Sequence, residues 1–187
     1  MNRTKRLIID VFWQFLEEKP YNKITVQNIV DCCQMNRNTF YYHFQDIPAL
    51  AEYSIEEWAN RIIADYYEFG SLLNCIIPIA QELVRRKKAF LNIYRSAHRD
   101  EFMRYLNKIG FHIVQSYVEN ATKNLDVLLD DSSDLIRYYK CVFVGVVYDW
   151  LDAGTAYDLL SFCEKICSSF EGAGKRALLG QAKETLL

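Results

Sequence analysis

Hydrophobic residues recur at helical spacing along most of the chain. The first such segment places six apolar side chains on one face of a helix over residues 3–18: Leu7, Ile8, Val11, Phe12, Phe15 and Leu16. Pro20 ends this helix, because a proline disfavours the helical conformation in the residue before it. The chain therefore opens with an amphipathic helix.

Two short helices follow, separated by a tight turn. Thr25 has a side chain suited to the N-cap of a helix over residues 26–33. Residues 34–35 form the turn, and Asn36 is suited to the N-cap of the next helix, over residues 37–44. This pair of helices is short enough for a helix-turn-helix motif.

The rest of the chain also has a helical pattern. Asp46 caps a fourth helix that runs to about residue 67, and further helices are predicted over residues 72–87, 89–96, 101–122, 133–152 and 156–170. No segment has the alternation of a strand. We therefore expect an all-α fold of about nine helices, with a three-helix N-terminal domain over residues 1–46. A larger helical bundle takes residues 47–187, of which 171–187 form a flexible tail.

Composition supports a helical globular protein. The chain has 187 residues, of which 51% are hydrophobic and 25% charged, so it can bury a core without disulfides or metals. Its seven glycines and three prolines are too few for the many turns of an all-β fold. None of the six cysteines forms a CxxC pair, and no histidine is spaced with them as a zinc ligand. We expect no metal and no cofactor.

The location of the protein follows from the same residues. No signal peptide opens the chain, and no apolar run approaches the ~20 residues of a membrane span. Free cysteines are typical of a reducing compartment. We therefore expect a cytoplasmic protein without a membrane partner.

The charge is weak evidence against binding to DNA, because the net charge is −2. Residues 1–50 carry six basic and five acidic side chains, whereas residues 51–187 carry 16 basic and 19 acidic ones. Arg3, Lys5 and Arg6 stand together at the start, where an arm or a first helix can lie against phosphate. The N-terminal residues thus have a slightly positive net charge and the rest of the chain a negative one, which is the distribution that a DNA-binding N-terminal domain requires.

The second short helix carries the functional signal. In a helix-turn-helix, the N-terminal residues of this helix face base edges in the major groove. Here these base-reading positions are Asn36, Arg37, Asn38 and Thr39. Phosphate contacts are expected from four further side chains: Thr25, Tyr41, Tyr42 and His43. Phe40 and Phe44, at i and i+4, are expected in the core.

These residues resemble the Tet repressor (TetR) family. The resemblance lies in residues 24–30 (ITVQNIV) and 36–44 (NRNTFYYHF), within a motif region of about residues 5–52. It implies a DNA-binding regulator, usually a repressor relieved by a small molecule, with a helical domain for the ligand and for dimerisation. Two positions depart from the family pattern. Gln34 stands where the family usually has glycine, and Ile47 stands where it usually has a lysine that contacts phosphate.

The larger domain is rich in aromatic residues, which predicts a pocket for a small-molecule effector between its helices. The candidate pocket residues are Trp58, Tyr94, Phe102, Tyr117, Tyr139 and Phe143. The last two helices are apolar over a wide arc and are expected to form a four-helix dimer interface with a second copy. The candidate interface residues are Tyr138, Val142, Gly145, Val146, Trp150, Leu159, Cys163, Ile166 and Phe170.

Three functions remain in view. The first is a homodimeric repressor that binds a double-stranded DNA operator and responds to a small molecule. The second keeps the fold but makes it a co-activator or regulator that is controlled by a protein partner. The third, an enzyme, is not expected, because no acid–base pair, metal cluster or phosphate-binding loop supports it.

Overall fold

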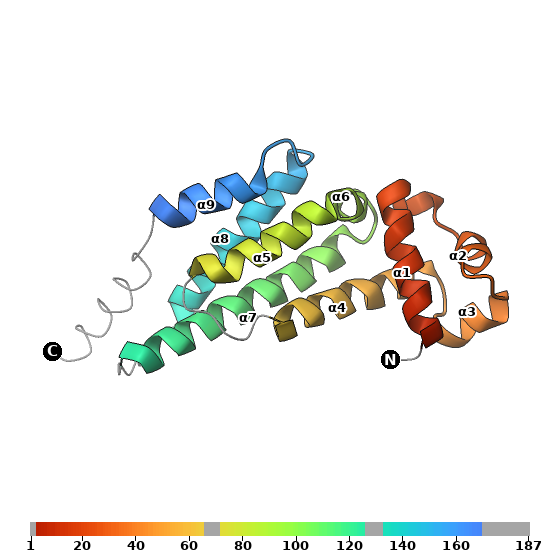
Figure 1. Cartoon of the computed structure of the whole chain (residues 1–187), viewed down its shortest axis with the longest axis horizontal. Coiled ribbons are helices and arrows are strands. Elements are labelled where there is room, and N and C mark those ends of the chain that lie inside the picture. Colours follow the sequence, from red (N-terminus) through yellow and green to blue (C-terminus); the bar gives the residue numbers. More distant parts are fainter. Residues whose placement is uncertain (1–2, 66–71, 126–132, 170–187) are drawn as a thin grey trace. The chain divides into compact units, whose positions relative to one another are not determined.

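The fold is seen in a computed structural model that describes residues 3–65, 72–125 and 133–169. These residues form nine α-helices and one short 3-10 helix, and none of them lies in a strand (Figure 1). The elements are α1 (Arg3–Glu18), η1 (Tyr21–Lys23), α2 (Val26–Cys32), α3 (Arg37–His43), α4 (Ile47–Asp65), α5 (Leu72–Arg85), α6 (Lys87–Tyr94), α7 (Arg99–Leu125), α8 (Ser133–Asp152) and α9 (Leu159–Ser169). The predicted all-α fold is confirmed. The predicted tail over residues 171–187 lies outside the described residues.

Most predicted boundaries agree with the structure to within two residues. Two boundaries differ by three residues, since α7 runs to Leu125 rather than to residue 122 and the last helix begins at Leu159 rather than at residue 156. The carboxylate of Asp158 accepts a hydrogen bond from the backbone N–H of Ser161 (3.1 Å) and so caps the helix at that point. The segment before Asp158 belongs to the turn from α8 to α9.

The contacts between Cα atoms divide the chain into two compact units. Unit 1 contains Met1–Asn60 and Arg85–Tyr105, and unit 2 contains Arg61–Val84 and Leu106–Leu187. Unit 1 therefore joins the first helices of the chain to α6, which comes much later in the sequence. This division groups residues by the contacts between their Cα atoms. It does not test the domain boundary predicted after residue 46, which stays a prediction.

In unit 1, α1 is buried over a wider arc than its sequence pattern predicts. Ile9 and Trp13 are buried, although they lie outside the predicted apolar face. Leu7, which was predicted on that face, is 44% exposed, and Phe15 is half-buried. The reason is that α1 packs against α2 and also against α6, so two of its sides are covered.

The contact between α1 and α6 includes a polar cap. The side-chain amide of Asn92 on α6 donates hydrogen bonds to the carbonyl oxygens of Leu16 (2.8 Å) and Lys19 (3.2 Å). Carbonyls at the C-terminus of a helix have no partner within the helix, and here an amide from a distant segment supplies one. The end of α1 is thus tied to α6.

Aromatic rings form the core of unit 1 beneath this cap. The ring of Phe90 lies 5.6 Å from Trp13, 4.8 Å from Trp58 and 5.6 Å from Phe102, measured between centroids. Trp58, Phe90 and Phe102 have no exposed surface. Burial of such large side chains is a major source of stability, since each removes a large apolar area from water.

In unit 2, the turn from α8 to α9 is fixed by two residues with positive φ. Gly154 has φ 68° and Thr155 has φ 61°, and the backbone N–H of Thr155 donates to the carbonyl of Trp150 (2.8 Å). The indole N–H of Trp150 donates to the carbonyl of Tyr157 (3.1 Å), so the buried tryptophan also holds the turn. The predicted end of the helix at residue 152 is confirmed.

Candidate nucleic-acid interface

The first helix of the motif, α2, begins with a reciprocal cap. The hydroxyl oxygen of Thr25 accepts from the backbone N–H of Asn28 (3.2 Å), and the Asn28 side chain accepts from the backbone N–H of Thr25 (3.2 Å). The N-cap predicted at Thr25 is confirmed. Because the cap uses the hydroxyl only as an acceptor, its proton remains for an outside oxygen, and Thr25 is exposed.

The turn between α2 and α3 has a backbone that normally favours glycine. Gln34 has φ 53°, in the left-handed region, and the next backbone N–H, of Met35, donates to the carbonyl of Val30 (3.0 Å). This is the position at which the resemblance leads one to expect glycine. Gln34 therefore adopts the conformation of the family turn in spite of its side chain, at a cost of about 1–2 kcal/mol.

Asn36 starts α3. Its side-chain oxygen accepts from the backbone N–H of Thr39 (2.8 Å) and from the Thr39 hydroxyl (3.1 Å). The predicted N-cap is confirmed. The cap uses the oxygen of Asn36 twice, which leaves the amide NH2 as the group that Asn36 presents outward.

Arg37 is held against α2 by a short chain of hydrogen bonds. Its Nε donates to Oε1 of Gln27 (2.8 Å), and Nε2 of Gln27 donates to the carboxylate of Asp31 (2.5 Å). All three side chains are exposed. The hydrogen bond to Gln27 uses only one guanidinium nitrogen of Arg37, Nε. A bidentate contact with guanine uses two guanidinium nitrogens that point the same way, and Nη1 and Nη2 remain for it. Gln27 is not among the residues predicted to act at the DNA interface, although its spacing of four from Asp31 places both on one face of α2.

Two phenylalanines anchor α3. Phe40 has no exposed surface and Phe44 is 5% exposed, and their ring centroids are 6.1 Å apart. Phe44 also packs on Tyr53 of α4 at 5.6 Å. The predicted core positions of Phe40 and Phe44 are confirmed, and they fix which face of α3 turns outward.

That outward face carries two large exposed aromatic side chains. Tyr41 is 52% exposed and Tyr42 is 82% exposed, although burial would be favourable for both. His43 is half-buried, and its ring lies 5.0 Å from that of Tyr42. Asn38 is exposed and Thr39 half-buried. Of the eight predicted DNA-binding residues, six lie on α3 and the other two directly precede α2 and α3, and six of the eight side chains are exposed.

The basic residues at the start of α1 are engaged within unit 1 to different degrees. Arg6 pairs with Asp10 (3.3 Å) and with Glu57 (3.0 Å). The ammonium of Lys5 lies 3.5 Å from the ring centroid of Tyr53, a cation–π contact. Arg3 is exposed. Of the three cations that the sequence places near phosphate, two therefore have intramolecular partners.

A surface hollow lies between the start of α1 and the helix-turn-helix. It is lined by Arg3, Thr4, Arg6, Leu7, Asp10, Cys33, Met35 and Thr39. Burial, with a smaller contribution from Cys32, raises the pKa of the Cys33 thiol to about 11. Cys33 is thus a neutral thiol near neutral pH, which fits a packing role rather than a nucleophilic one.

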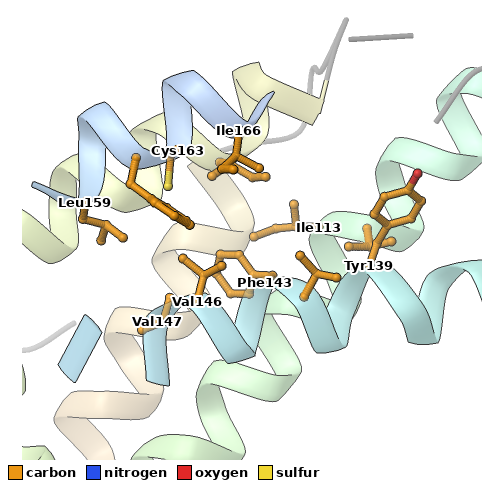
Figure 2. A pocket seen from close by; sticks show the side chains of 12 residues that line it. Ile113, Tyr139, Phe143, Val146, Val147, Leu159, Cys163 and Ile166 are labelled. Carbon is orange, nitrogen blue, oxygen red and sulfur yellow. The ribbon is translucent and has the colours of Figure 1, made fainter. Parts of the chain in front are cut away.

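A second candidate site is a cavity in unit 2, where side chains from α5, α7, α8 and α9 meet (Figure 2). Its volume is about 70 Å³. It is lined by Ile76, Ile113, Val114, Tyr139, Val142, Phe143, Val146, Val147, Leu159, Phe162, Cys163 and Ile166.

The predicted effector residues divide between this cavity and other places. Tyr139 and Phe143 line the cavity. Trp58, Tyr94 and Phe102 are buried in unit 1 and do not line it. Tyr117 packs against a small core cluster of Val114, Val118 and Ile136. Most of the lining is aliphatic, and nothing in the sequence separates such residues from an ordinary core.

The predicted dimer residues differ in how much surface they offer. Tyr138, Val142 and Ile166 are 62%, 42% and 40% exposed, and Gly145 is exposed too. Val146 is half-buried, while Trp150, Leu159 and Cys163 are buried within the chain itself. Phe170 lies outside the described residues. The exposed members form an apolar face on α8 and α9, and five of the predicted residues also line the cavity: Val142, Val146, Leu159, Cys163 and Ile166.

Two further features bear on the class of protein. Among the described residues, no group of three or more His, Cys, Asp or Glu side chains is arranged to hold a metal ion. None of the helices in the described ranges is both long enough and apolar enough to cross a bilayer.

Family models match both parts of the chain. Residues 8–53 match the model for bacterial regulatory proteins of the tetR family, and residues 70–172 match a transcriptional regulator C-terminal region. No curated protein sequence matches the chain.

Solved structures show the same fold at low sequence identity. The dihydroxyacetone kinase operon activator DhaS is 18% identical with a TM-score of 0.76, and the match covers 97% of each chain. The fatty acid degradation regulator FadR from Bacillus halodurans is 16% identical with a TM-score of 0.67, and the match covers 89% of this chain and 93% of that one. Salmonella enterica GusR is 19% identical with a TM-score of 0.61 and coverages of 96% and 95%. Together with the two family models, which span the helix-turn-helix and the C-terminal region, the motif places the chain in the tetR family of transcriptional regulators.

Proposed function

We propose that the protein is a homodimeric, ligand-responsive repressor that acts in the cytoplasm by binding a DNA operator. The observation that carries the proposal is the outward face of α3. There, Arg37, Asn38, Tyr41 and Tyr42 are exposed on a short helix that Phe40 and Phe44 anchor from below. The major groove of DNA is wide enough to admit a helix such as α3. The arginine at the start of α3 and the exposed tyrosines that follow it are suited to contacts in that groove.

On DNA, the start of α3 faces the bases. Arg37 donates two hydrogen bonds to a guanine, and Asn38 pairs with an adenine edge. Gln27 holds Arg37 in advance through a 2.8 Å hydrogen bond, which lowers the entropy that the arginine loses on binding. The hydroxyls of Thr25, Tyr41 and Tyr42 and the ring of His43 donate to phosphates.

Two copies would read two half-sites. The exposed apolar face of α8 and α9 supplies a surface that a second copy can bury, and a two-fold axis would place two α3 helices on successive major grooves. An effector would shift the relative placement of the two DNA-binding parts, a coupling worth about 1–3 kcal/mol.

The experiment starts with selection of binding sites from random DNA, followed by electrophoretic mobility shifts on the selected site. Arg37→Ala should weaken operator binding by about 1–3 kcal/mol and relax the preference at one base position. Tyr42→Ala should weaken binding without changing that preference. Arg137→Ala removes another exposed arginine, from α8, and serves as the matched control. If both α3 variants bind like the parent, α3 is not the recognition helix.

A second candidate is an activator that is controlled by a protein partner. The activating sign is the one described for DhaS, an operon activator with the same fold. A promoter reporter distinguishes the two signs of regulation. Expression that falls when the chain is supplied supports the repressor, and expression that rises supports the activator.

A further inference from the structure

The cavity of unit 2 has walls that are almost entirely hydrocarbon. Among the described residues that line it, none is charged, and the side chains are aliphatic or aromatic apart from the thiol of Cys163. Tyr139 is the one lining side chain with a hydroxyl, and in Figure 2 that hydroxyl points away from the cluster around Phe143 and Val146. A ligand in this cavity therefore meets carbon and sulfur rather than hydrogen-bond donors.

Such walls discriminate strongly between ligand classes. A polar group that is buried without a partner loses its hydrogen bonds to water, and a buried charge loses far more. Metabolites that carry phosphates, carboxylates or several hydroxyls at the inserted end are therefore excluded. An apolar cavity also holds water poorly, so a hydrocarbon group enters it without displacing well-bound water.

The size of the cavity further restricts the class of ligand that it can hold. The cavity volume of about 70 Å³ is less than half of the ~150 Å³ of an apolar cavity that accepts benzene. A flat ring therefore fits less well than a slender, unbranched chain. Among the lining residues, Phe162 of α9 is exposed, so the remainder of a longer ligand can leave the cavity beside its ring.

We propose that the effector of this regulator inserts an uncharged, unbranched alkyl chain into the cavity between α5, α7, α8 and α9. This inference rests on the proposed function, because it names the chemical class of the effector.

One close packing contact sets the width of the cavity. A Cβ added at Gly110 of α7 would lie 2.8 Å from Cδ1 of Phe143, closer than such atoms approach in real structures. Phe143 also lines the cavity, so its ring would have to move away from α7, and the cavity is the open space beside it. Gly110→Ala should therefore narrow the cavity without adding any polar group.

The test measures the binding of 1-octanol to the parent chain by isothermal titration calorimetry. 1,8-Octanediol is the matched ligand, since it has the same chain but must bury a hydroxyl at the inserted end. We expect 1-octanol to bind at least tenfold more tightly than the diol. Equal affinities for the two compounds, or no binding of 1-octanol by the parent chain, overturns the inference.

Three variants assign the binding to this cavity. Gly110→Ala should weaken the binding of 1-octanol at least tenfold. Ile113→Phe fills the cavity from α7 and should weaken the binding of 1-octanol by the same factor, so it tests the assignment even if Gly110→Ala fails to fold. Gln81→Ala is the control, because Gln81 is exposed on α5 and does not line the cavity. Unchanged binding by a folded Ile113→Phe chain overturns the assignment.

Operator binding separates this inference from the proposed function. 1-Octanol should change the operator affinity of the parent several-fold and leave that of Ile113→Phe unchanged. A chain that binds operator without responding to 1-octanol overturns the effector class and leaves DNA binding intact. A chain that binds 1-octanol but no DNA overturns the proposed function and, with it, the effector role.

Discussion

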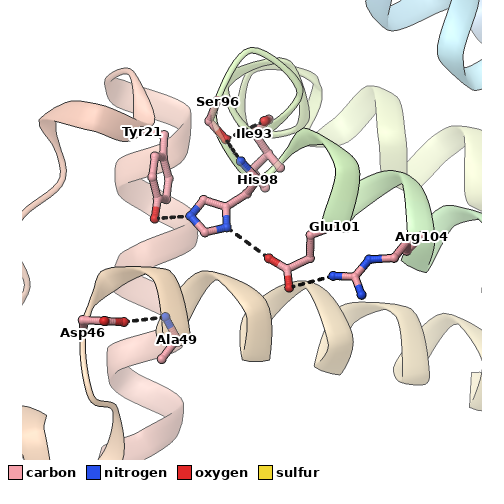
Figure 3. Close-up of polar contacts among 8 residues, drawn as sticks. All are labelled: Tyr21, Asp46, Ala49, Ile93, Ser96, His98, Glu101 and Arg104. Atoms are coloured by element: carbon pink, nitrogen blue, oxygen red, sulfur yellow. Dashed lines mark hydrogen bonds and ion pairs between the residues drawn. The ribbon is translucent and has the colours of Figure 1, made fainter.

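The phenolic oxygen of Tyr21 lies 2.7 Å from Nε2 of His98, and this hydrogen bond joins η1 to the turn between α6 and α7 (Figure 3). The other ring nitrogen of His98 lies 3.0 Å from the carboxylate of Glu101, which in turn lies 3.5 Å from Arg104. Because η1 leads directly into Thr25, the start of α2 is held by residues from a distant part of the chain. The helix-turn-helix is therefore positioned by α6 and α7 within unit 1 as well as by α1.

Removing the Tyr21 hydroxyl should destabilise the protein. Tyr21→Phe leaves Nε2 of His98, whose side chain is 16% exposed, without a partner, and the expected loss is about 1–2 kcal/mol in the free energy of unfolding. Urea denaturation followed by circular dichroism measures it. Tyr42→Phe removes a hydroxyl from a side chain that is 82% exposed and should change stability by less than about 0.5 kcal/mol. Equal effects of the two substitutions would contradict the structural role of this hydrogen bond.

Stability should fall at alkaline pH. Burial, followed by the charges of Asp46 and Glu101, raises the pKa of Tyr21 to about 12 from 10.0. Burial, with a hydrogen bond to Asp149, raises the pKa of Tyr157 to about 12 as well. Each pKa is higher in the folded state than in the unfolded state, so their contribution is complete below pH 10 and is lost as the pH rises towards 12.

Urea midpoints at pH 9, 10 and 11 measure this loss. The Tyr21→Phe chain lacks one of the two tyrosines whose pKa is raised in the folded state. Its free energy of unfolding should therefore fall less steeply above pH 10 than that of the parent. A parent and a variant with identical pH profiles would show that Tyr21 does not contribute to the alkaline loss.

The local features of the interface were predictable from sequence, whereas the packing of distant segments was not. Caps depend on one side chain and its neighbours, so Thr25 and Asn36 could be identified directly, and the spacing of Phe40 and Phe44 fixed the outward face of α3. Burial of Trp13 depends on Phe90, which comes far later in the chain. Local periodicity contains no information on that contact.

The cavity illustrates the same limit for function. Aromatic side chains are the usual signal of a ligand pocket, yet Trp58 and Phe102 serve as core packing. The walls of the cavity are mostly valines and isoleucines, whose sequence pattern is that of any buried helix face. Only the arrangement of α5, α7, α8 and α9 shows that these side chains leave a space.

The turn of the helix-turn-helix predicts a stabilising substitution. Gln34 has φ 53°, a conformation that costs a residue with a Cβ about 1–2 kcal/mol and costs glycine little. Glycine loses about 0.5–1 kcal/mol more backbone entropy on folding, which offsets part of the gain. Gln34→Gly should therefore raise the free energy of unfolding by up to about 1.5 kcal/mol, measured by thermal and urea denaturation. Gln34→Ala keeps the Cβ and should give no gain, and a stabilisation by alanine equal to that by glycine would show that backbone strain is not the cause.

The proposed dimer predicts opposite effects of one substitution on folding and on assembly. Gly145 lies in the middle of α8 and is exposed, and a Cβ added there meets nothing within 4 Å in the single chain. A glycine in mid-helix costs about 1 kcal/mol relative to alanine, so Gly145→Leu should stabilise the helix itself. If α8 crosses a second copy closely at Gly145, the leucine side chain overpacks that contact, at a cost of about 1–3 kcal/mol. Sedimentation equilibrium should then show a dimer at least tenfold weaker, together with an unchanged or higher melting temperature of the monomer.

Arg95→Leu is the control for an added surface leucine, since Arg95 is exposed and belongs to unit 1, whereas α8 and α9 belong to unit 2. It should leave the monomer–dimer equilibrium unchanged. Tyr138 and Val142 precede Gly145 on α8 by seven and three residues and share its side of the helix, so alanine at either position should weaken the dimer through lost apolar contact rather than through a clash. A Gly145→Leu chain that dimerises as tightly as the parent would place the interface away from the middle of α8.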